Sequence, residues 1–169
     1  MTILVTGGVR SGKSRHAESL LADRPEVTYV APGPVRDDAD WAARVALHQA
    51  RRPAHWSTLE TGDLASALDT PGPVLVDCLG TWLTRLVDDA GLWDARSEDV
   101  SAYVEEQVDA AIPLLHHDVV LVTNEVGWGV VPEHRSGRLF RDLLGEANRR
   151  FAAASDEVHL VVAGRVLRL

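Results

Sequence analysis

The densest chemical signal in the sequence is a glycine-rich segment near the N-terminus, Gly7-Gly8-Val9-Arg10-Ser11-Gly12-Lys13-Ser14. It matches the pattern G-x-x-x-x-G-K-[ST], follows a short apolar run, and opens a stretch with helical periodicity. Glycines let backbone N–H groups surround phosphates, while Lys13 would reach the β- and γ-phosphate oxygens and Ser14 would ligate Mg²⁺. We therefore expect this segment to be a P-loop that binds a nucleoside triphosphate.

The lysine of this segment is the only lysine in a chain that otherwise uses arginine for its cations. Lysine carries a compact ammonium on a flexible stem, whereas arginine presents a planar guanidinium fork. A position that keeps lysine against this bias is one where the compact charge is needed. We therefore predict a catalytic role for Lys13 at the phosphoryl group that is transferred.

A second candidate is the carboxylate of Asp77, which closes the apolar run Val74-Leu75-Val76. In a parallel sheet the carboxyl ends of the strands share one edge, and ligands bind in the crevice outside it. A carboxylate there, next to a phosphate loop, is typical of the Walker B position that holds Mg²⁺ directly or through water. Asp77 is thus the predicted metal residue beside Ser14, and the alternative is an aspartate that only ends a strand in a turn.

The third candidate is an imidazole among arginines, in the pattern Arg44-x-x-x-His48-x-x-Arg51-Arg52-Pro53. On a helix this spacing places His48 between guanidinium groups on one face. A neutral imidazole is a competent nucleophile toward phosphorus, and arginines would stabilise charge on the phosphoryl oxygens. On spacing alone, however, a solvated helix face with an idle histidine is the better interpretation.

A fourth segment combines a strand end, two glycines and a proline between Thr123 and Pro132. It predicts a loop at the substrate-binding edge of the sheet. Arginines follow it in steps of three, at Arg135, Arg138 and Arg141. They would either clamp a substrate phosphate or form a surface face paired with Asp142 or Glu146.

The elements that must position these residues are strands alternating with amphipathic helices, the pattern of a parallel sheet with crossover helices. We predict strands at Thr2–Thr6, Val27–Ala31, Trp56–Leu59, Val74–Asp77, Val119–Thr123, Val158–Val162 and Val166–Leu169, the last as an antiparallel edge strand. We predict helices at Lys13–Ala22, Ala39–Arg51, Leu64–Leu68, Thr81–Asp89, Ser97–Leu115 and Ser136–Ala154. The predicted fold is α/β and P-loop NTPase-like: one domain over residues 1–169, with helices on both faces of a mostly parallel sheet.

Composition excludes several classes of partner. The chain has 169 residues with 17 Lys+Arg and 25 Asp+Glu, a formal net charge of −8, which disfavours binding to nucleic acid or anionic membranes. The single cysteine, Cys78, excludes an intrachain disulfide framework and a multi-cysteine zinc site. With neither a signal-peptide pattern nor an apolar run long enough to span a bilayer, we expect a cytoplasmic protein.

Together these segments resemble the family of bifunctional adenosylcobinamide kinases / adenosylcobinamide-phosphate guanylyltransferases of cobalamin biosynthesis, over almost the whole chain. The resemblance lies in the glycine-rich loop and in His48-x-x-x-Arg52-Pro53-x-x-Trp56-x-Thr58-x-Glu60. It continues in Thr123-Asn124-Glu125-Val126-Gly127-x-Gly129-x-Val131-Pro132, Phe140-Arg141-Asp142-x-x-Gly145-x-x-Asn148 and Ala154-x-Asp156-Glu157-Val158. One departure is Gly80, a glycine at a position where the family pattern has a bulkier residue.

The resemblance implies two reactions on a corrinoid substrate. A nucleoside triphosphate, ATP or GTP, would phosphorylate the aminopropanol hydroxyl of adenosylcobinamide, and GMP would then pass from GTP to that phosphate with release of pyrophosphate. The resemblance also implies that His48 carries GMP covalently and that the chain forms a homotrimer. Beyond the glycine-rich loop, it implies GTP contacts at Pro32, Gly33, Pro34, Gln49, Ala50, Arg51, Arg52, Glu60 and Asp77.

Two other functions remain open on the sequence. A simple P-loop kinase of a small molecule would use the same loop without a nucleotidyl step. A non-catalytic nucleotide-binding switch would also use the loop, but it gives no reason for His48 among arginines. Retention of the GTP α-phosphate on the protein would distinguish the bifunctional enzyme from both.

Overall fold

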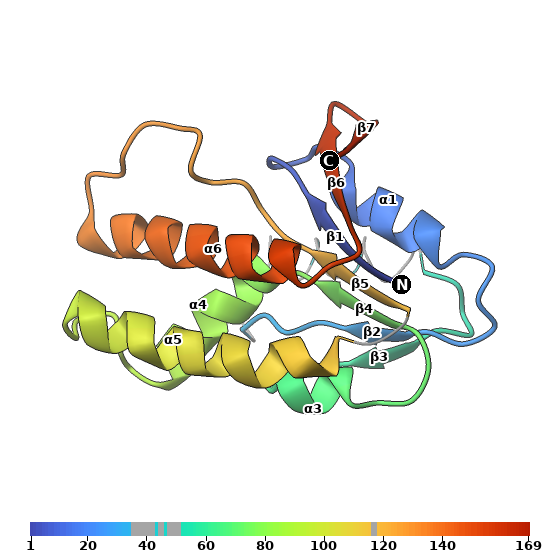
Figure 1. Ribbon diagram of the computed structural model, residues 1–169, viewed down its shortest axis with the longest axis horizontal. Coiled ribbons are helices and arrows are strands. Elements are labelled where there is room, and N and C mark those ends of the chain that lie inside the picture. The colour runs from blue at the N-terminus through green and yellow to red at the C-terminus, as the bar shows by residue number, and fades with distance from the viewer. Residues whose placement is uncertain (35–42, 44–45, 47–51, 116–117) are drawn as a thin grey trace.

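The computed structural model describes residues 1–34, 43, 46, 52–115 and 118–169, and its strands form one seven-stranded sheet (Figure 1). The strands lie in the order β3-β2-β4-β5-β1-β6-β7, and every neighbouring pair is parallel except β6 and β7. Their bounds are β1 Thr2–Thr6, β2 Thr28–Val30, β3 Ser57–Leu59, β4 Val74–Asp77, β5 Val119–Val122, β6 Glu157–Val162 and β7 Arg165–Arg168. The predicted mostly parallel sheet with an antiparallel last strand is confirmed.

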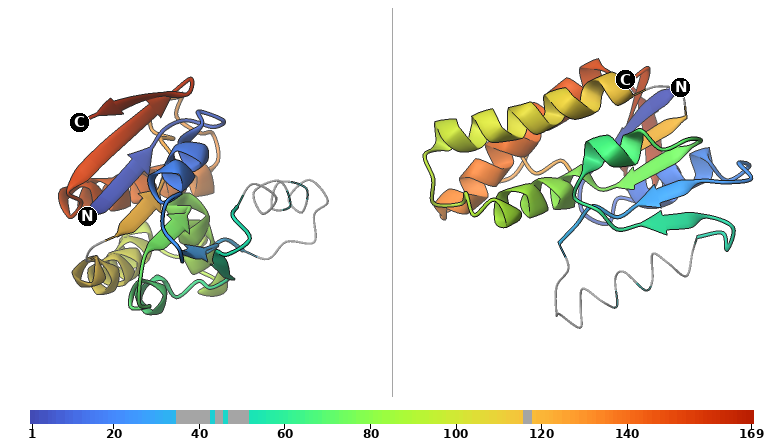
Figure 2. Two further views of the ribbon diagram at one scale, coloured as in Figure 1. Left: turned by 90° about the vertical axis from the view of Figure 1, so that its right-hand side faces the viewer. Right: turned by 90° about the horizontal axis from the view of Figure 1, so that it is seen from below.

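Helices cover both faces of this sheet, because successive strand residues point to opposite sides. In β1, Ile3 and Val5 pack in one core cluster with Ala17 of α1, whereas Leu4 packs in a second cluster with residues of the other helices. The helices are α1 Lys13–Leu20, α3 Leu64–Leu68, α4 Leu79–Asp89, α5 Ser97–Ala111, the 3-10 helix η1 Ile112–Leu114, and α6 Arg135–Ala153. The long helices α5 and α6 lie side by side (Figures 1 and 2). No helix in the described ranges combines the length and apolar character needed to cross a bilayer.

Several helix boundaries differ from the prediction by one to four residues, and two of these differences have a clear local reason. α5 was expected to reach Leu115, but it gives way to a 3-10 turn at Pro113, whose ring nitrogen has no hydrogen to continue the helical ladder. α4 begins at Leu79 rather than Thr81, because Cys78 forms its N-cap and donates its backbone N–H to the Thr81 hydroxyl (3.4 Å). The predicted helix at 39–51 falls mostly outside the described residues.

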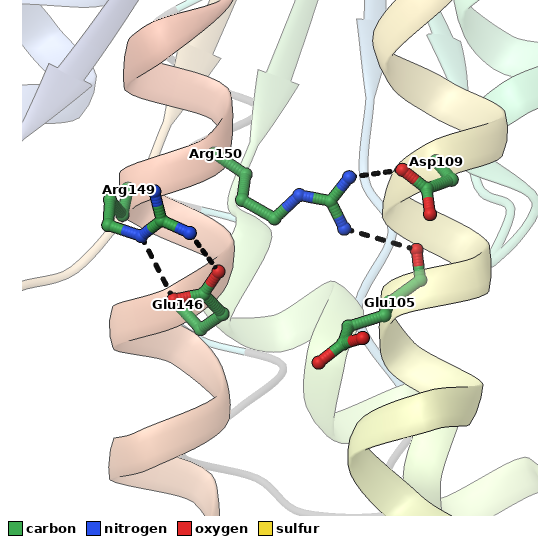
Figure 3. Close-up of polar contacts among 5 residues, drawn as sticks. All are labelled: Glu105, Asp109, Glu146, Arg149 and Arg150. Atoms are coloured by element: carbon green, nitrogen blue, oxygen red, sulfur yellow. Dashed lines mark hydrogen bonds and ion pairs between the residues drawn. The ribbon is translucent and has the colours of Figure 1, made fainter.

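The helical layer is held by an apolar centre and a polar rim. At the centre, Phe151 of α6 is fully buried and meets Trp82 of α4 edge to face, with ring centroids 6.1 Å apart. At the rim, Figure 3 shows Arg150 reaching from α6 to α5, where it binds the Asp109 carboxylate and the Glu105 carbonyl. Arg149, on the neighbouring position, pairs within its own helix with Glu146. This layer fixes the position of α6, whose N-terminal half holds a loop of the candidate site.

We expect Phe151→Ala to lower the free energy of unfolding by about 3–5 kcal/mol, because it opens a cavity against Trp82 in the buried layer. Arg149→Ala is the matched control. Its side chain is 71% exposed and its ion pair is local, so its removal should cost less than about 1 kcal/mol. Urea denaturation followed by tryptophan fluorescence measures both. Equal losses in the two variants would contradict a core centred on Phe151.

Candidate active site at the carboxyl edge of the sheet

Five adjacent parallel strands end at one edge of the sheet, and the predicted site residues lie along it. In strand order these are the segment Gly7–Ser14 after β1, Thr123–Glu125 after β5, Asp77 at the end of β4, Pro32–Pro34 after β2 and Glu60 after β3. Neighbouring strands are about 4.8 Å apart, so β4 lies roughly 10 Å and β3 roughly 19 Å from β1. The topology therefore brings residues from distant parts of the sequence into one row.

The segment Gly7–Ser14, called the phosphate loop below, is shaped by two glycines. Gly12 has φ +98°, a left-handed conformation that favours glycine, and it forms the N-cap from which α1 starts at Lys13. A Cβ at Gly7 would lie 2.4 Å from the Val161 carbonyl oxygen, so only glycine fits against β6. α1 therefore begins directly at the end of the loop, and the first N–H groups of a helix, which lack intrahelical partners, provide an anion site.

Two polar groups of the phosphate loop fit a bound anion. The Ser11 hydroxyl is buried and has no hydrogen-bond partner among the described residues. Lys13 is only 8% exposed, and its ammonium donates to the Gly8 carbonyl of the same loop (3.1 Å). Phosphate oxygens would satisfy the first group and offer the second a stronger, charged acceptor.

Lys13 also lies close enough to the end of β4 to influence the pKa of Cys78, the residue that follows this strand. Burial raises the pKa of the Cys78 thiol, and the Asp77 carboxylate raises it further. Hydrogen bonds involving Thr81 oppose that rise in the Cys78 pKa, and so does the Lys13 ammonium. The lysine of the phosphate loop and the carboxylate of β4 thus belong to one electrostatic neighbourhood.

Asp77 accepts a hydrogen bond from Tyr29, a residue that the sequence analysis missed. The Tyr29 ring is 2% exposed, and its hydroxyl donates to Asp77 Oδ2 (3.0 Å). Burial raises the pKa of Tyr29, with a further rise from Asp77, so its proton stays on the hydroxyl. The Arg52 guanidinium carbon lies 3.3 Å from the Tyr29 ring centroid, and Arg52 also donates to Thr58. The structure therefore connects Arg52 to Asp77 through one buried ring.

A polar network fixes the segment after β5. Thr123 donates its hydroxyl to the Asn148 side chain (2.6 Å), and Asn148 donates in turn to the Asn124 carbonyl (3.1 Å). The Cys78 thiol donates to Asn124 Oδ1 (3.2 Å). The same oxygen would lie 2.8 Å from a Cβ at Gly80, so the small residue makes room for Asn124. The glycine that departs from the family pattern thus has a packing reason.

Two of the three arginines singled out in the sequence hold a loop by its backbone carbonyls, an arrangement that the sequence did not predict. Arg141 donates to the carbonyls of Gly127 and Gly129, and Arg138 donates to those of Pro132 and Glu133. Arg135 donates to the carbonyls of Trp93 and Ala95 instead. The alternative in which these arginines pair with Glu146 is wrong, because Glu146 binds Arg149.

This loop, residues 126–134, presents apolar side chains although its backbone is held in place. Trp128 is 73% exposed and Val130 is 94% exposed. It begins directly after Glu125, beside the phosphate loop. An ordered apolar surface next to a phosphate site suits an acceptor that has a large organic body and one polar reacting group.

A second set of residues that the sequence did not reveal connects α1 to β6. His159 of β6 is 1% exposed, and its ring contacts His16 of α1 (2.9 Å) on one side and Glu157 (2.8 Å) on the other. Burial lowers the pKa of His16, and both His159 and Arg168 lower it further, which favours the neutral ring. This chain of side chains joins the helix of the phosphate loop to the edge of the sheet.

The remaining predicted site residues divide into two groups. His48, Gln49, Ala50 and Arg51 lie outside the described residues. Pro32 is buried, Glu60 is exposed, and the Gly33 carbonyl accepts a hydrogen bond from Arg85 (3.4 Å). The described chain stops at Pro34, after β2, and resumes at Arg52, before β3.

With this arrangement in view, comparison with known proteins identifies the family. A family model described as cobinamide kinase / cobinamide phosphate guanyltransferase matches residues 3–169. The chain belongs to this family. It is 46% identical to the bifunctional adenosylcobalamin biosynthesis protein CobU of Salmonella typhimurium, over 97% of each chain. It is 45% identical to the protein of the same name from Escherichia coli K12, again over 97% of each chain. The expectation of a bifunctional cobinamide kinase and guanylyltransferase is confirmed.

Solved structures confirm the fold of this cobinamide kinase / guanyltransferase family member. An ATPase from the type III secretion system of pathogenic bacteria superposes with a TM-score of 0.54 at 12% identity, covering 94% of this chain and 50% of that one. At that identity the likeness concerns the fold alone. It agrees with the P-loop NTPase-like class predicted from the phosphate loop and the parallel sheet.

Proposed function

We propose that residues 1–169 form a single catalytic domain that carries out both family reactions along the carboxyl edge of its sheet. The observation that supports this most directly is the row formed by the phosphate loop, the 123–125 segment and Asp77. The exposed apolar loop 126–134 adjoins the phosphate loop and would receive the corrinoid. Nucleotide and acceptor would then meet at the ends of β1 and β5.

In the kinase reaction the phosphate loop would hold ATP or GTP, with Lys13 at the β- and γ-phosphates. The aminopropanol oxygen of adenosylcobinamide attacks the γ-phosphorus, and the bond to the β–γ bridging oxygen breaks, releasing the nucleoside diphosphate. Lys13 would leave the Gly8 carbonyl for the phosphate oxygens, where its charge stabilises the transition state. The water-poor, preorganised loop makes that charge more effective than it would be in bulk solvent.

Mg²⁺ would be held by the Ser14 hydroxyl and the Asp77 carboxylate together with phosphate oxygens. Both are the hard oxygen donors that this ion prefers. The described residues include no cluster of three His, Cys, Asp or Glu side chains able to hold a metal ion, which suits an ion held by few protein ligands and the substrate. When bound, Mg²⁺ neutralises charge on the phosphates. Tyr29 would keep the Asp77 carboxylate oriented through its hydrogen bond.

In the guanylyl reaction His48 would be the nucleophile. Its imidazole nitrogen attacks the α-phosphorus of GTP, a phosphorus–nitrogen bond forms, and pyrophosphate leaves. The phosphate of adenosylcobinamide phosphate then attacks the same phosphorus and releases the imidazole, giving adenosyl-GDP-cobinamide. Contacts to GTP would come from Gln49, Ala50, Arg51 and Arg52 and from the far end of the row, at Pro32, Gly33, Pro34 and Glu60. This assignment rests on the family motif.

The homotrimer and the cytoplasmic location are also proposals. A reaction that consumes nucleoside triphosphates and a chain with a single cysteine both suit the cytoplasm. The acidic net charge of −8 supports small-molecule partners rather than nucleic acid. Sedimentation of the purified protein would give its oligomeric state.

Asp77→Asn should raise the Mg²⁺ concentration needed for half-maximal kinase activity by at least about tenfold, since a neutral amide binds the ion poorly. The control is Tyr29→Phe, which removes the hydrogen bond to Asp77 but keeps the carboxylate. It should shift the Mg²⁺ titration much less. Coincident titrations of Asp77→Asn and wild type would assign Asp77 to the structure of the turn instead.

Incubation with GTP labelled at the α-phosphate and Mg²⁺, without acceptor, should leave label on His48 and release one pyrophosphate for each label bound. A phosphoramidate is acid-labile and base-stable, and label in the γ-phosphate should not be retained. His48→Ala should abolish labelling while part of the kinase activity survives, and His55→Ala is the matched control that should still label. Labelling of His48→Ala at the wild-type level would identify another nucleophile. A wild type that phosphorylates the corrinoid but never labels would be a simple kinase, and one that binds nucleotide without turnover would be a switch.

A further inference from the structure

Glu125 occupies the position between the two predicted phosphate-handling elements, yet none of the steps above uses it. It follows β5, which lies between β1, the strand of the phosphate loop, and β4, the strand of Asp77. Its backbone N–H donates to the Gly7 carbonyl (3.2 Å), and the Thr6 hydroxyl donates to its Oε1 (2.7 Å). The side chain is half-buried. The two hydrogen bonds tie Glu125 directly to the start of the phosphate loop.

The charge of this carboxylate calls for an explanation. Within the described part of the chain Glu125 makes no salt bridge, and only Oε1 accepts a hydrogen bond. An anion beside a triphosphate weakens binding by repulsion, so a purely structural acceptor for Thr6 would be better served by an uncharged amide. A carboxylate has a lone pair basic enough to take a proton, which an amide lacks.

The kinase reaction has such a proton. The aminopropanol hydroxyl must lose it as its oxygen bonds to the γ-phosphorus. Lys13 is a cation and offers no acceptor lone pair. The segment 123–125 lies next to the loop that holds the γ-phosphate, on the side from which the apolar loop 126–134 continues.

We propose that Glu125 is the general base of the kinase reaction. Its Oε2 accepts the proton of the substrate hydroxyl while the hydroxyl oxygen forms its bond to the γ-phosphorus, and the electron pair of the broken phosphorus–oxygen bond leaves with the nucleoside diphosphate. Thr6 positions the carboxylate by holding Oε1. The proposal rests on the proposed placement of the triphosphate in the phosphate loop.

The two reactions of the enzyme separate this role from a structural one. In guanylyl transfer the acceptor is a phosphate, which is already an anion and has no hydroxyl proton to lose. A base is therefore needed in the first reaction and not in the second. Loss of the Glu125 carboxylate should affect the two rates unequally, whereas collapse of the phosphate loop should affect nucleotide binding as well.

The test is Glu125→Gln, assayed separately for phosphorylation of adenosylcobinamide and for guanylyl transfer to supplied adenosylcobinamide phosphate. We expect kcat of the kinase reaction to fall by at least about 100-fold, the usual contribution of a general base, with KM for the triphosphate within about threefold of wild type. Guanylyl transfer should stay within about threefold. Glu106→Gln, which neutralises an exposed glutamate of α5 far from this edge of the sheet, should leave both rates unchanged. Glu125→Asp keeps a carboxylate and should retain more kinase activity than Glu125→Gln.

Three results would overturn the assignment: kinase activity of Glu125→Gln within about threefold of wild type, an equal fall in both reactions, or no advantage of Glu125→Asp over Glu125→Gln. Should Glu125→Gln fail to fold, the same comparison between Glu125→Asp and wild type decides, with the kinase rate expected to fall and guanylyl transfer to persist. A wild type that shows no kinase activity would instead count against the proposed function, which separates the two failures.

Discussion

The phosphate loop depends on a close backbone approach at Gly7. A Cβ at this position would lie 2.4 Å from the Val161 carbonyl of β6, while the Gly7 carbonyl accepts a hydrogen bond from the backbone of Glu125 after β5. The start of the loop is thus held between the two strands that flank β1. Any side chain at Gly7 would push the loop away from β6, and with it the N-terminus of α1 and Lys13. The chemistry proposed for this edge requires that both stay in place.

The rest of the molecule supports this edge from both faces. On one side, the buried His159 contacts His16 and so ties α1 to β6. On the other, the packing of Phe151 against Trp82 sets α6, and Arg138 and Arg141 of α6 hold the 126–134 loop by its carbonyls. The loop can therefore present exposed apolar side chains without losing its own shape. A rigid site with one apolar wall suits a substrate that is large and organic at one end and reacts at a single hydroxyl.

The sequence was sufficient to predict those parts of the site and fold that residue type and spacing identify. The glycines, lysine and serine of the phosphate loop have few other reasons to occur together, and Asp77 stands at the end of an unmistakable apolar run. The alternation of such runs with amphipathic stretches was enough to predict the parallel sheet and its helices on both faces. The antiparallel last strand was predicted as well.

Contacts to backbone groups, and contacts between residues far apart in the chain, could not be predicted because no residue type or spacing indicates them. Every loop has carbonyls, so the sequence could not show that Arg138 and Arg141 bind those of the 126–134 loop. Tyr29 reads as an ordinary buried strand residue, and only the order β2-β4 brings its hydroxyl to Asp77. In the sequence alone Gly80 has no evident reason to replace a bulkier residue, but in the structure Asn124 occupies the space that a side chain there would need. Strand order, which decides the last two, depends on packing between segments far apart in the chain.

The most direct measurement is a crystal structure of the protein with Mg²⁺ and a non-hydrolysable ATP analogue. The β- and γ-phosphates should lie in the phosphate loop, with Lys13 Nζ moved from the Gly8 carbonyl to their oxygens and the metal ion between the Ser14 hydroxyl and Asp77. The Glu125 carboxylate should face the γ-phosphate from the β5 side. An analogue bound elsewhere on the molecule, with Lys13 still on the Gly8 carbonyl, would contradict the assignment of this edge as the site of phosphoryl transfer.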